Sequence, residues 1–282
     1  MTLGCYILMQ NPKTNNYPYL EVINCCLDLF DEILIVDGGT DDGSIEEIDK
    51  RYEYLGDKTK IPHEDKVKII ERLWSVNADW DFLTQQYDCG LQNLTTDWRM
   101  KVDADFLFHE HDLWQIREFL YGHRDYRIVS FEKAAFNLID RYRSKTKVGL
   151  AVNKKMYPNI HWNTDDKYQD GDEVLEEETW IPSGIKVYSY DNCFKTKDNI
   201  KKTMYKFAKA VYKKYGKNWG HESPEAALKF FIDMARTRFD AHNQSEIPLE
   251  AHPKYIQEKI KNMTEEQLGF SLFGYKKASY FA

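Results

Sequence analysis

The sequence predicts an α/β fold: a mostly parallel sheet flanked by helices, followed by a helical C-terminal part. Apolar runs of strand length alternate with segments of helical periodicity over the first 120 residues, and acidic residues directly follow two of these runs. Strands that alternate with helices imply parallel pairing, with helices on both faces of the sheet. Ligands of such sheets bind beyond the carboxyl ends of the strands.

The first β-α-β unit is predicted within the first 44 residues. Residues 4–9 (GCYILM) and 33–36 (ILIV) have the composition of buried strands, and residues 19–29 have the apolar spacing of a helix. The segment 38–44 (GGTDDGS) combines glycines that permit a tight turn with Ser44, a candidate helix N-cap. The alternation then continues with predicted strands at 68–73 and 98–102 and predicted helices at 81–94 and 112–121.

The character of the chain changes near residue 163. Residues 165–178 hold eight acids and one lysine without clean periodicity, which predicts a loop-rich segment. After a short strand at 184–190, helices are predicted at 199–215, from Ser223-Pro224 to about 239, from Pro253, and from Thr264. We therefore expect an α/β domain over residues 1–190, with a helical region, 191–282, packed on it.

Composition excludes several classes of protein. The chain has 282 residues, a formal net charge of -7 and 42% hydrophobic residues, which excludes a wholly disordered chain. Its longest apolar runs are far shorter than the ~18 residues of a membrane span. The five cysteines show no C-x-x-C spacing, and no basic-then-apolar leader precedes Gly4, so we expect a cytoplasmic protein without disulfides. The acidic total argues against a general nucleic-acid coat.

Two groups of carboxylates follow predicted strands. Asp103-Ala104-Asp105 comes directly after the strand at 98–102, and two carboxylates at a strand end suit Mg²⁺ or Mn²⁺ with phosphate oxygens and water as further ligands. Asp37 ends the second strand and could accept hydrogen bonds from a base or ribose. These three acids can also have structural roles only, because an Asp at the end of a strand often caps a turn or remains solvated. The chain has no G-x-G-x-x-G or G-x-x-x-x-G-K-[ST] motif, which argues against a dinucleotide or P-loop site.

Several segments together resemble glycosyltransferase family 2. The segment 37–44 (DGGTDDGS) is similar to the family's D-x-G-S-x-D-G-T, and it is preceded by residues 30–33 (FDEI) and by Asn11. Residues 97–105 (DWRMKVDAD) are similar to D-W-x-x-x-x-D-A-D-E. Between them, a segment with Gln86 and Gly90-Leu91 resembles the family's helix that carries a Gln or Arg-Asn pair. The likeness covers residues 3–110 and, more faintly, 185–210, where 187–190 (VYSY) resembles the H-Y-S-Y region of lipopolysaccharide core glycosyltransferases.

The resemblance implies a GT-A (Rossmann-like) fold and a metal-dependent inverting glycosyltransferase. The implied donor is a nucleotide-diphosphate sugar, with a UDP-sugar expected, and the implied cofactor is Mn²⁺ or Mg²⁺. Asn11, Asp37, Gln86 and Asp103 would bind the nucleotide sugar, and Asp103 and Asp105 would hold the metal. A catalytic base would take the proton from the acceptor hydroxyl. We expect this base in the acidic segment, as Asp172 or Glu173.

The chain departs from the family pattern at three places. Asn11 is followed by Pro12-Lys13 rather than by acids, Phe106 stands where an acid follows the triplet, and Val187 stands where the related enzymes have His. A histidine metal ligand must therefore come from elsewhere or be absent. Residues 109–112 (HEHD) lie just past the triplet and could supply acceptor contacts or a second metal ligand, although a His beside a helix start is more often structural.

The acceptor is left open by the sequence. Residues 195–217 hold nine lysines and one acid, a charge of +8 against -15 for the rest of the chain. This is typical of a solvated amphipathic helix, of contact with an anionic glycan or lipid headgroup, or of binding to DNA. We expect a glycan or other saccharide acceptor. The alternatives are modified bases of viral DNA, or a non-catalytic sugar- or nucleic-acid-binding protein of the same fold. A sugar nucleotidyltransferase would need a Gly-rich basic loop after the first strand, which residues 9–12 lack.

Overall fold

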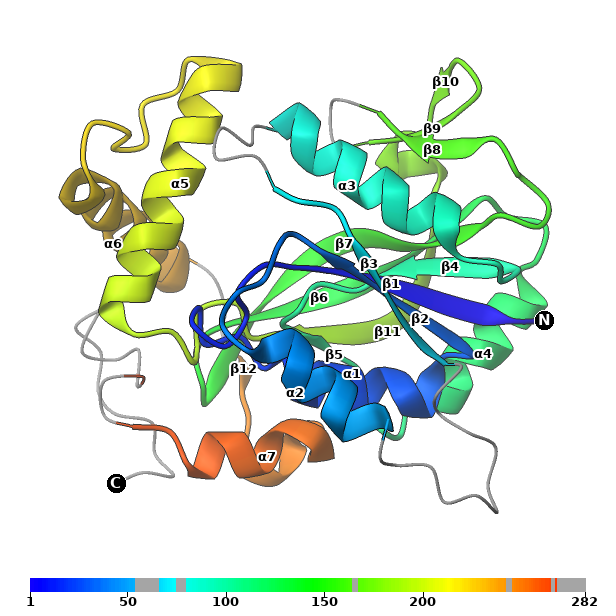
Figure 1. The fold of residues 1–282 in the computed structure, drawn as a ribbon, viewed down its shortest axis with the longest axis horizontal. Helices are drawn as coiled ribbons and strands as arrows, with labels where there is room; N and C mark the ends of the chain where they lie inside the picture. The colour runs from blue at the N-terminus through cyan, green and yellow to red at the C-terminus, as the bar shows by residue number, and fades with distance from the viewer. Residues whose placement is uncertain (54–65, 75–79, 164–166, 242–244, 265–266, 268–282) are drawn as a thin grey trace.

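The computed structural model describes residues 1–53, 66–74, 80–163, 167–241, 245–264 and 267 (Figure 1). The strands of its main sheet are β1 (Leu3–Met9), β2 (Glu32–Asp37), β3 (Val67–Glu71), β4 (Trp98–Lys101), β5 (Phe106–Leu107), β6 (Ile128–Leu138), β7 (Arg141–Asn153), β11 (Ile181–Ser189) and β12 (Ser245–Glu246). A smaller sheet contains β8 (Ile160–Trp162), β9 (Tyr168–Asp170) and β10 (Glu173–Val174). The helices are α1 (Tyr19–Leu29), α2 (Ser44–Glu53), α3 (Trp80–Asn93), α4 (Leu113–Gly122), α5 (Lys197–Tyr215), α6 (Pro224–Ala241) and α7 (Lys254–Lys261).

The predicted α/β fold is confirmed, and its parallel part is the N-terminal half of the main sheet. The strand order is β3-β2-β1-β4-β7-β6-β11-β5, and β12 pairs with the start of β7. Strands β3, β2, β1 and β4 pair in parallel, with Met9 of β1 opposite Asp37 of β2. These four strands are the ones the sequence predicts from their apolar runs.

The other half of the sheet is built around a long hairpin that was not predicted from the sequence. Strands β6 and β7 are joined by Ile139 and Asp140 only, so they pair antiparallel, and β7 in turn pairs antiparallel with β4. Parallel pairing returns between β6 and β11. The sheet is therefore parallel at its N-terminal half and mixed beyond β4.

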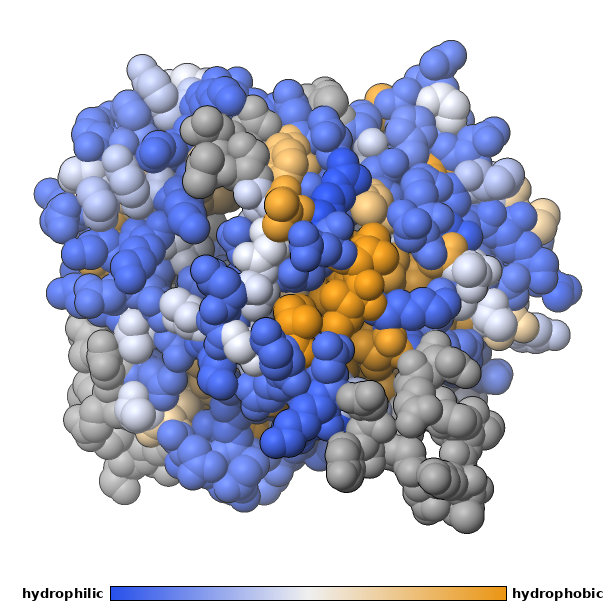
Figure 2. All heavy atoms as spheres, viewed as in Figure 1, coloured by the Kyte–Doolittle hydropathy of each residue, from blue (hydrophilic) through white to orange (hydrophobic). Residues whose placement is uncertain are grey.

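Alternation along β1 divides the core between the two faces of the sheet. Cys5 and Ile7 pack in a large apolar cluster with residues of α1, α4 and α7, whereas Tyr6 packs in a smaller cluster with Leu91 of α3. All these side chains are inaccessible to solvent. Figure 2 shows apolar surface where β2 and β3 lie in Figure 1, and every residue of the edge strand β3 is half-buried or exposed.

The C-terminal region is helical as predicted, with α5 and α6 packed on each other and α7 packed on α1. Helix α5 begins at the N-cap Thr196, whose side chain accepts the N–H of Asn199, and ends at Gly216 with φ +64°. The short helix predicted from Thr264 lies mostly outside the described residues. No helix in the described part of the chain is long and apolar enough to cross a membrane.

Candidate functional site

The carboxyl ends of β1, β2 and β4 meet at one edge of the main sheet, which we call the carboxyl edge. Because these strands are parallel neighbours, the segments that carry Asn11, Asp37 and Asp103 leave the sheet side by side. In Figure 1, β1 runs from the N-terminus toward α5, so the carboxyl edge faces that helix. This is the end of a parallel sheet at which ligands bind.

Asp37 organises the turn that follows β2. Its side chain is almost fully buried, and its carboxylate accepts the N–H of Gly39 at 3.3 Å, the N–H of Thr40 at 3.1 Å and the Thr40 hydroxyl at 2.5 Å. Gly39 has φ +87°, a conformation that favours glycine. The contact between Asp37 and a nucleobase stays a prediction, because its carboxylate already supports the turn.

Asn11 joins the loops after β1 and β2. Its side-chain oxygen accepts the N–H of Asp41 at 2.8 Å, and its own N–H donates to the Thr40 hydroxyl at 3.2 Å. A second contact runs from the N–H of Thr14 to Asp42 at 2.8 Å. Asn11 has φ +48°, which Asn tolerates better than most residues. The residue predicted to bind the donor is thus placed at the carboxyl edge, where its side chain fixes the loop.

Two side chains that follow β3 in the chain, Trp74 and Gln86, have buried hydrogen-bonding atoms without a partner in the described residues. The Trp74 indole lies against Gly38, where a Cβ atom would be only 2.7 Å from the ring. Within the part of the chain that the structure describes, the Trp74 indole N–H and both amide atoms of Gln86 are buried without a hydrogen-bond partner. Buried polar atoms are normally paired, so unpaired ones indicate a missing ligand or water. Gln86 was predicted to contact the nucleotide-sugar donor, whereas Trp74 was not.

Asp103 leaves β4 paired with a lysine. The Lys101 ammonium lies 3.2 Å from an Asp103 carboxylate oxygen and 4.2 Å from the centre of the Tyr87 ring. The Asp103 side chain is 32% exposed, so it can still be reached by a ligand from solvent. Lys101 holds a positive charge next to the predicted metal ligands.

Asp105 is the more deeply buried of the two carboxylates in the triplet. Its side chain accepts the Ser189 hydroxyl at 2.7 Å, which connects β5 to the end of β11. Burial first, and then the negative charge of Asp191, raise the pKa of Asp105 to about 7. The carboxylate therefore lacks enough neighbouring positive charge, the deficit that a bound cation would remove.

Asp191, which was not among the predicted site residues, lies beside Asp105. It follows β11 and forms an ion pair at 2.8 Å with Lys195, whose side chain is inaccessible to solvent. Lys195 also donates to the Tyr17 hydroxyl at 3.0 Å. Although partial burial acts in the opposite direction, the Lys195 ammonium holds the pKa of Asp191 below its usual range. The Asp191 side chain remains 44% exposed.

The donors at the carboxyl edge suit a hard divalent cation. Asp103, Asp105 and Asp191 offer carboxylate oxygens, and the side-chain oxygen of Asn192 is buried without a hydrogen-bond partner among the described residues. Oxygen donors of this kind match Mg²⁺ and Mn²⁺. Asp103 and Asp191 both act on the pKa of Asp105, but the three carboxylates do not converge on one point in the described structure. Ligand binding would have to complete the coordination.

Asp172 and Glu173 lie away from the carboxyl edge. They follow Gly171 at the turn between β9 and β10, and Glu173 forms a 2.7 Å ion pair with Arg127. Arg127 directly precedes β6, which runs in the same direction as β4, so this ion pair is at the opposite edge of the main sheet. Figure 1 likewise shows β10 on the side remote from α5. The structure therefore does not bring the expected base residues together with Asp37 and Asp105.

Helix α5 spans the outside of the carboxyl edge. Asn199 near its start donates to the Thr14 carbonyl at 2.7 Å, and Lys214 near its end pairs with Asp81 of α3 at 2.9 Å. Lys201 pairs with Glu225 of α6. The +8 segment is thus partly neutralised within the fold, although several of its lysines are exposed: Lys197, Lys202, Lys206, Lys209, Lys213 and Lys217.

One signal for Asp191 was present in the sequence. Like Asp37, it comes directly after a predicted strand, in this case the one at 184–190. The base was instead expected downstream of the Asp103-Ala104-Asp105 triplet in the acid-rich segment 165–178, on the acceptor side of the same sheet edge. Position at a strand end proved the better guide to the carboxyl edge.

Comparisons with known proteins identify structural neighbours but no sequence family. No protein-family model matches the sequence, and no curated protein matches it significantly. Solved structures that resemble it include glycosyltransferases. Staphylococcus aureus TarS 1-349 in complex with UDP-GlcNAc aligns with 97% of this chain and 80% of its own, at 11% identity and a TM-score of 0.43.

A second neighbour comes from another organism. The mannosyltransferase PcManGT from Pyrobaculum calidifontis, in complex with GDP-Man and Mn²⁺, aligns with 97% of this chain and 86% of its own. Its sequence identity is 11% and its TM-score is 0.46.

Proposed function

We propose that this protein is a metal-dependent inverting glycosyltransferase that uses a nucleotide-diphosphate sugar. The observation that carries the proposal is the gathering of Asp103, Asp105 and Asp191 at the carboxyl edge, beside the loop that Asp37 organises. Neighbouring carboxylates that alter one another's pKa are typical of functional sites. The motif spacing that predicted Asp37, Asp103 and Asp105 supports the same conclusion.

The donor nucleotide is proposed to bind at the ends of β1 and β2. The unpaired indole N–H of Trp74 and the unpaired amide of Gln86 supply donors and an acceptor for a nucleobase edge. Asn11 and Asp37 hold the intervening loop in shape. A UDP-sugar is the donor we propose, as the sequence resemblance implies.

Asp103 and Asp105 are proposed to hold Mg²⁺ or Mn²⁺, with the Asn192 side-chain oxygen available as a further ligand. When bound, the cation neutralises charge that develops on the departing diphosphate. Lys101, next to Asp103, adds a fixed positive charge there. Asp105 must lose its proton to serve as a ligand, so cation binding and proton release are coupled.

Asp191 replaces Asp172 and Glu173 as the proposed base. It is ionised, partly exposed and positioned next to Asp105 by Lys195. In the proposed step, the acceptor hydroxyl oxygen forms a bond to the anomeric carbon while the bond from that carbon to the diphosphate breaks. The hydroxyl proton passes to Asp191, and attack from the face opposite the leaving group inverts the anomeric centre.

The test compares three variants for hydrolysis or transfer of UDP-sugars in the presence of Mn²⁺. We expect Asp105→Asn and Asp191→Asn each to lower turnover by at least about 100-fold, the magnitude typical of lost acid-base or electrostatic groups. Asp172→Asn is the matched control, and we expect it to retain activity. Full activity of Asp191→Asn together with loss in Asp172→Asn would return the base to the acidic segment.

The acceptor is proposed to be a saccharide hydroxyl, and modified DNA is a second candidate. The exposed lysines of α5 favour the second candidate, because they are interspersed with the exposed aromatic side chains Phe207, Tyr212 and Tyr215. Binding of a nucleotide sugar without hydrolysis or transfer to any acceptor would instead favour a non-catalytic binding protein.

A further inference from the structure

A second cluster of metal-binding side chains lies between β5 and α4, and we call it the HEH cluster: His109, Glu110 and His111. One ligand atom from each residue lies within 4.8 Å of the other two. No other group of three His, Cys, Asp or Glu residues in the described ranges meets this condition. The cluster is distinct from the carboxyl edge, because β5 runs antiparallel to β11 and carries the chain away from Asp105.

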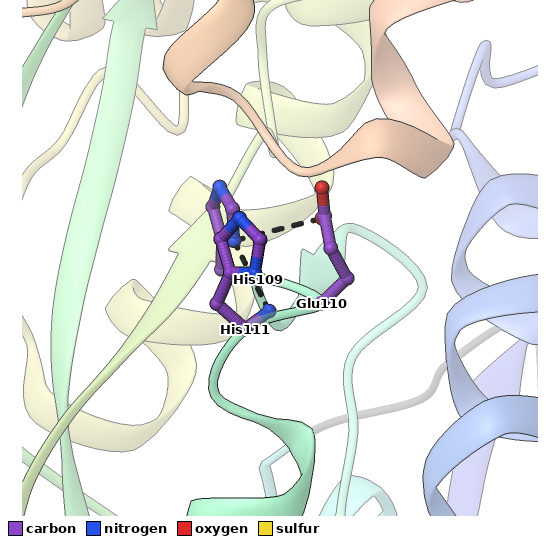
Figure 3. Close-up of side chains that lie close together, drawn as sticks. All are labelled: His109, Glu110 and His111. Carbon is purple, nitrogen blue, oxygen red and sulfur yellow. Dashed lines mark hydrogen bonds and ion pairs between the residues drawn. The ribbon is translucent and has the colours of Figure 1, made fainter.

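The two imidazole rings of the HEH cluster stack, with their centres 4.8 Å apart and an angle of 24° between their planes. The His109 Nδ1 atom lies 3.6 Å from a Glu110 carboxylate oxygen. Figure 3 shows the rings side by side, with Glu110 pointing toward the segment that leads into α7. His109 and Glu110 are largely covered, whereas His111 is exposed.

Asp112 adds a fourth donor next to the HEH cluster. It occupies the N-cap of α4, yet its side chain makes no capping hydrogen bond to that helix. An Asp at this position normally accepts a backbone N–H of the first turn. Its carboxylate is therefore available to a ligand on the same side of the loop, although the Lys186 ammonium also acts on it.

We propose that the HEH cluster, with Asp112, binds one Zn²⁺ ion. Two imidazoles with carboxylates are the ligand set that favours Zn²⁺ over Mg²⁺, whereas the oxygen donors of the carboxyl edge favour the reverse. Zn–ligand distances of about 2.0–2.2 Å place tetrahedral ligand atoms roughly 3.3–3.6 Å apart. The three ligand atoms lie within 4.8 Å of one another, so a rotation of the exposed His111 side chain would have to bring them about 1.2–1.5 Å closer together.

The proposed ion would fix the C-terminal segment to the sheet. Glu110 accepts the backbone N–H of Lys254 at 2.9 Å, directly at the start of α7. A cation on Glu110 would polarise and orient this carboxylate. We therefore expect Zn²⁺ to stabilise the contact between the β5–α4 loop and α7, a structural role that does not depend on the proposed function.

The test is a Zn²⁺ titration of the tag-free full chain against a chromophoric chelator. We expect one Zn²⁺ per chain, and we expect the double variant His109→Gln/His111→Gln to bind at least tenfold more weakly. His161→Gln, a half-exposed histidine outside the cluster, is the matched control and should bind Zn²⁺ like the unmodified chain. Asp105→Asn should also bind Zn²⁺ normally, which separates this site from the carboxyl edge.

A thermal-unfolding series provides the second measurement. Zn²⁺ should raise the unfolding temperature of the unmodified chain and of His161→Gln, but not that of the double variant, because a ligand stabilises only the fold that binds it. Circular dichroism without metal establishes that the double variant is folded. Equal Zn²⁺ affinity in the double variant and the unmodified chain would overturn the proposal, as would Zn²⁺ binding that is weakened equally in His161→Gln.

Discussion

At the scale of single residues, Asp105 is an acid whose surroundings disfavour its ionised form. Its carboxylate is buried next to two other acids and receives one hydroxyl hydrogen bond, from Ser189. Desolvation and the nearby acids both favour the protonated form. The metal-free fold therefore holds a proton at Asp105 that the unfolded chain releases at much lower pH.

This conflict predicts a pH-dependent gain in stability for Asp105→Asn. An unfolded Asp titrates near pH 3.9, and the folded pKa is about 7, so the native state binds more protons between these values. Stability from this group is present at low pH and is lost as pH rises through 7. We expect Asp105→Asn to stabilise the metal-free protein at pH 8 by more than about 1 kcal/mol, and by little at pH 4.

Urea unfolding in the presence of a chelator measures this difference at the two pH values. Saturating Mn²⁺ should remove it, because the proposed cation stabilises the ionised carboxylate. If the variant is equally or less stable than the unmodified chain at pH 8, the inference that ionised Asp105 destabilises the metal-free fold is wrong.

The residues at the carboxyl edge could be predicted only in part. Asp37 and Asp103 directly follow strands whose apolar runs are visible in the sequence, and Asp105 is two residues further. The partners of Asp105 and Lys195 come from distant segments, namely Ser189 and Tyr17. Neither spacing nor composition shows which distant side chains meet, so Trp74 and the contact between Lys195 and Tyr17 were missed.

At the scale of elements, a buried histidine links the segment before α7 to the main sheet. His252 is inaccessible to solvent and forms a 2.8 Å hydrogen bond with the Tyr190 hydroxyl, next to Asp191. Its ring also lies 5.1 Å from that of Phe136 in β6. This contact joins the C-terminal segment to the residue beside the proposed base.

Acid should weaken this contact. Burial lowers the pKa of His252 to about 4, whereas an unfolded His titrates near 6.5. Below pH 6.5 the unfolded chain binds a proton that the native state excludes, so stability from this group is lost as pH falls toward 4. The expected slope approaches about 1.4 kcal/mol per pH unit.

His252→Gln keeps a hydrogen-bonding group for Tyr190. In this variant, the free energy of unfolding should decrease less steeply as the pH falls from 7 to 5. Thermal unfolding at half-unit steps of pH measures this dependence of stability on pH. An equally steep decrease in the variant would assign the acid sensitivity to other groups.

The elements themselves were predicted unevenly. The parallel strands and α1 were visible because apolar runs with helical or strand periodicity are local signals. The β6–β7 hairpin was missed, because residues 128–153 mix apolar positions with many lysines and arginines and form register irregularities rather than clean alternation. The small sheet of β8, β9 and β10 consists of strands of two or three residues, too short for a periodic signal.

At the scale of the whole molecule, the net charge of -7 combines two surfaces of opposite sign. Acids gather at the carboxyl edge, and α5 presents exposed lysines on the outside of the same edge. A nucleotide sugar and an anionic acceptor could approach from this side of the molecule. The acceptor can therefore be identified by testing what the exposed lysines of α5 bind.

Salt dependence separates the two candidate acceptors. If α5 contacts DNA, binding to duplex DNA should weaken steeply with salt. Replacing Lys202, Lys206 and Lys209 by Gln should then reduce the slope by about 0.9 for each phosphate that is no longer neutralised. A set of Gln substitutions at exposed lysines elsewhere, such as Lys50 and Lys155, is the control. Absence of DNA binding at low salt would leave the saccharide acceptor as the proposal.

The central claim is that the carboxyl edge binds a nucleotide diphosphate through a cation held by Asp103 and Asp105. The most direct measurement is the thermal shift produced by UDP with and without Mn²⁺, in the unmodified chain and in Asp105→Asn. The account predicts a large shift with UDP and Mn²⁺ together, and a shift at least several-fold smaller with either alone or in the variant. An equal shift in Asp105→Asn, or no shift with any nucleoside diphosphate, would contradict it.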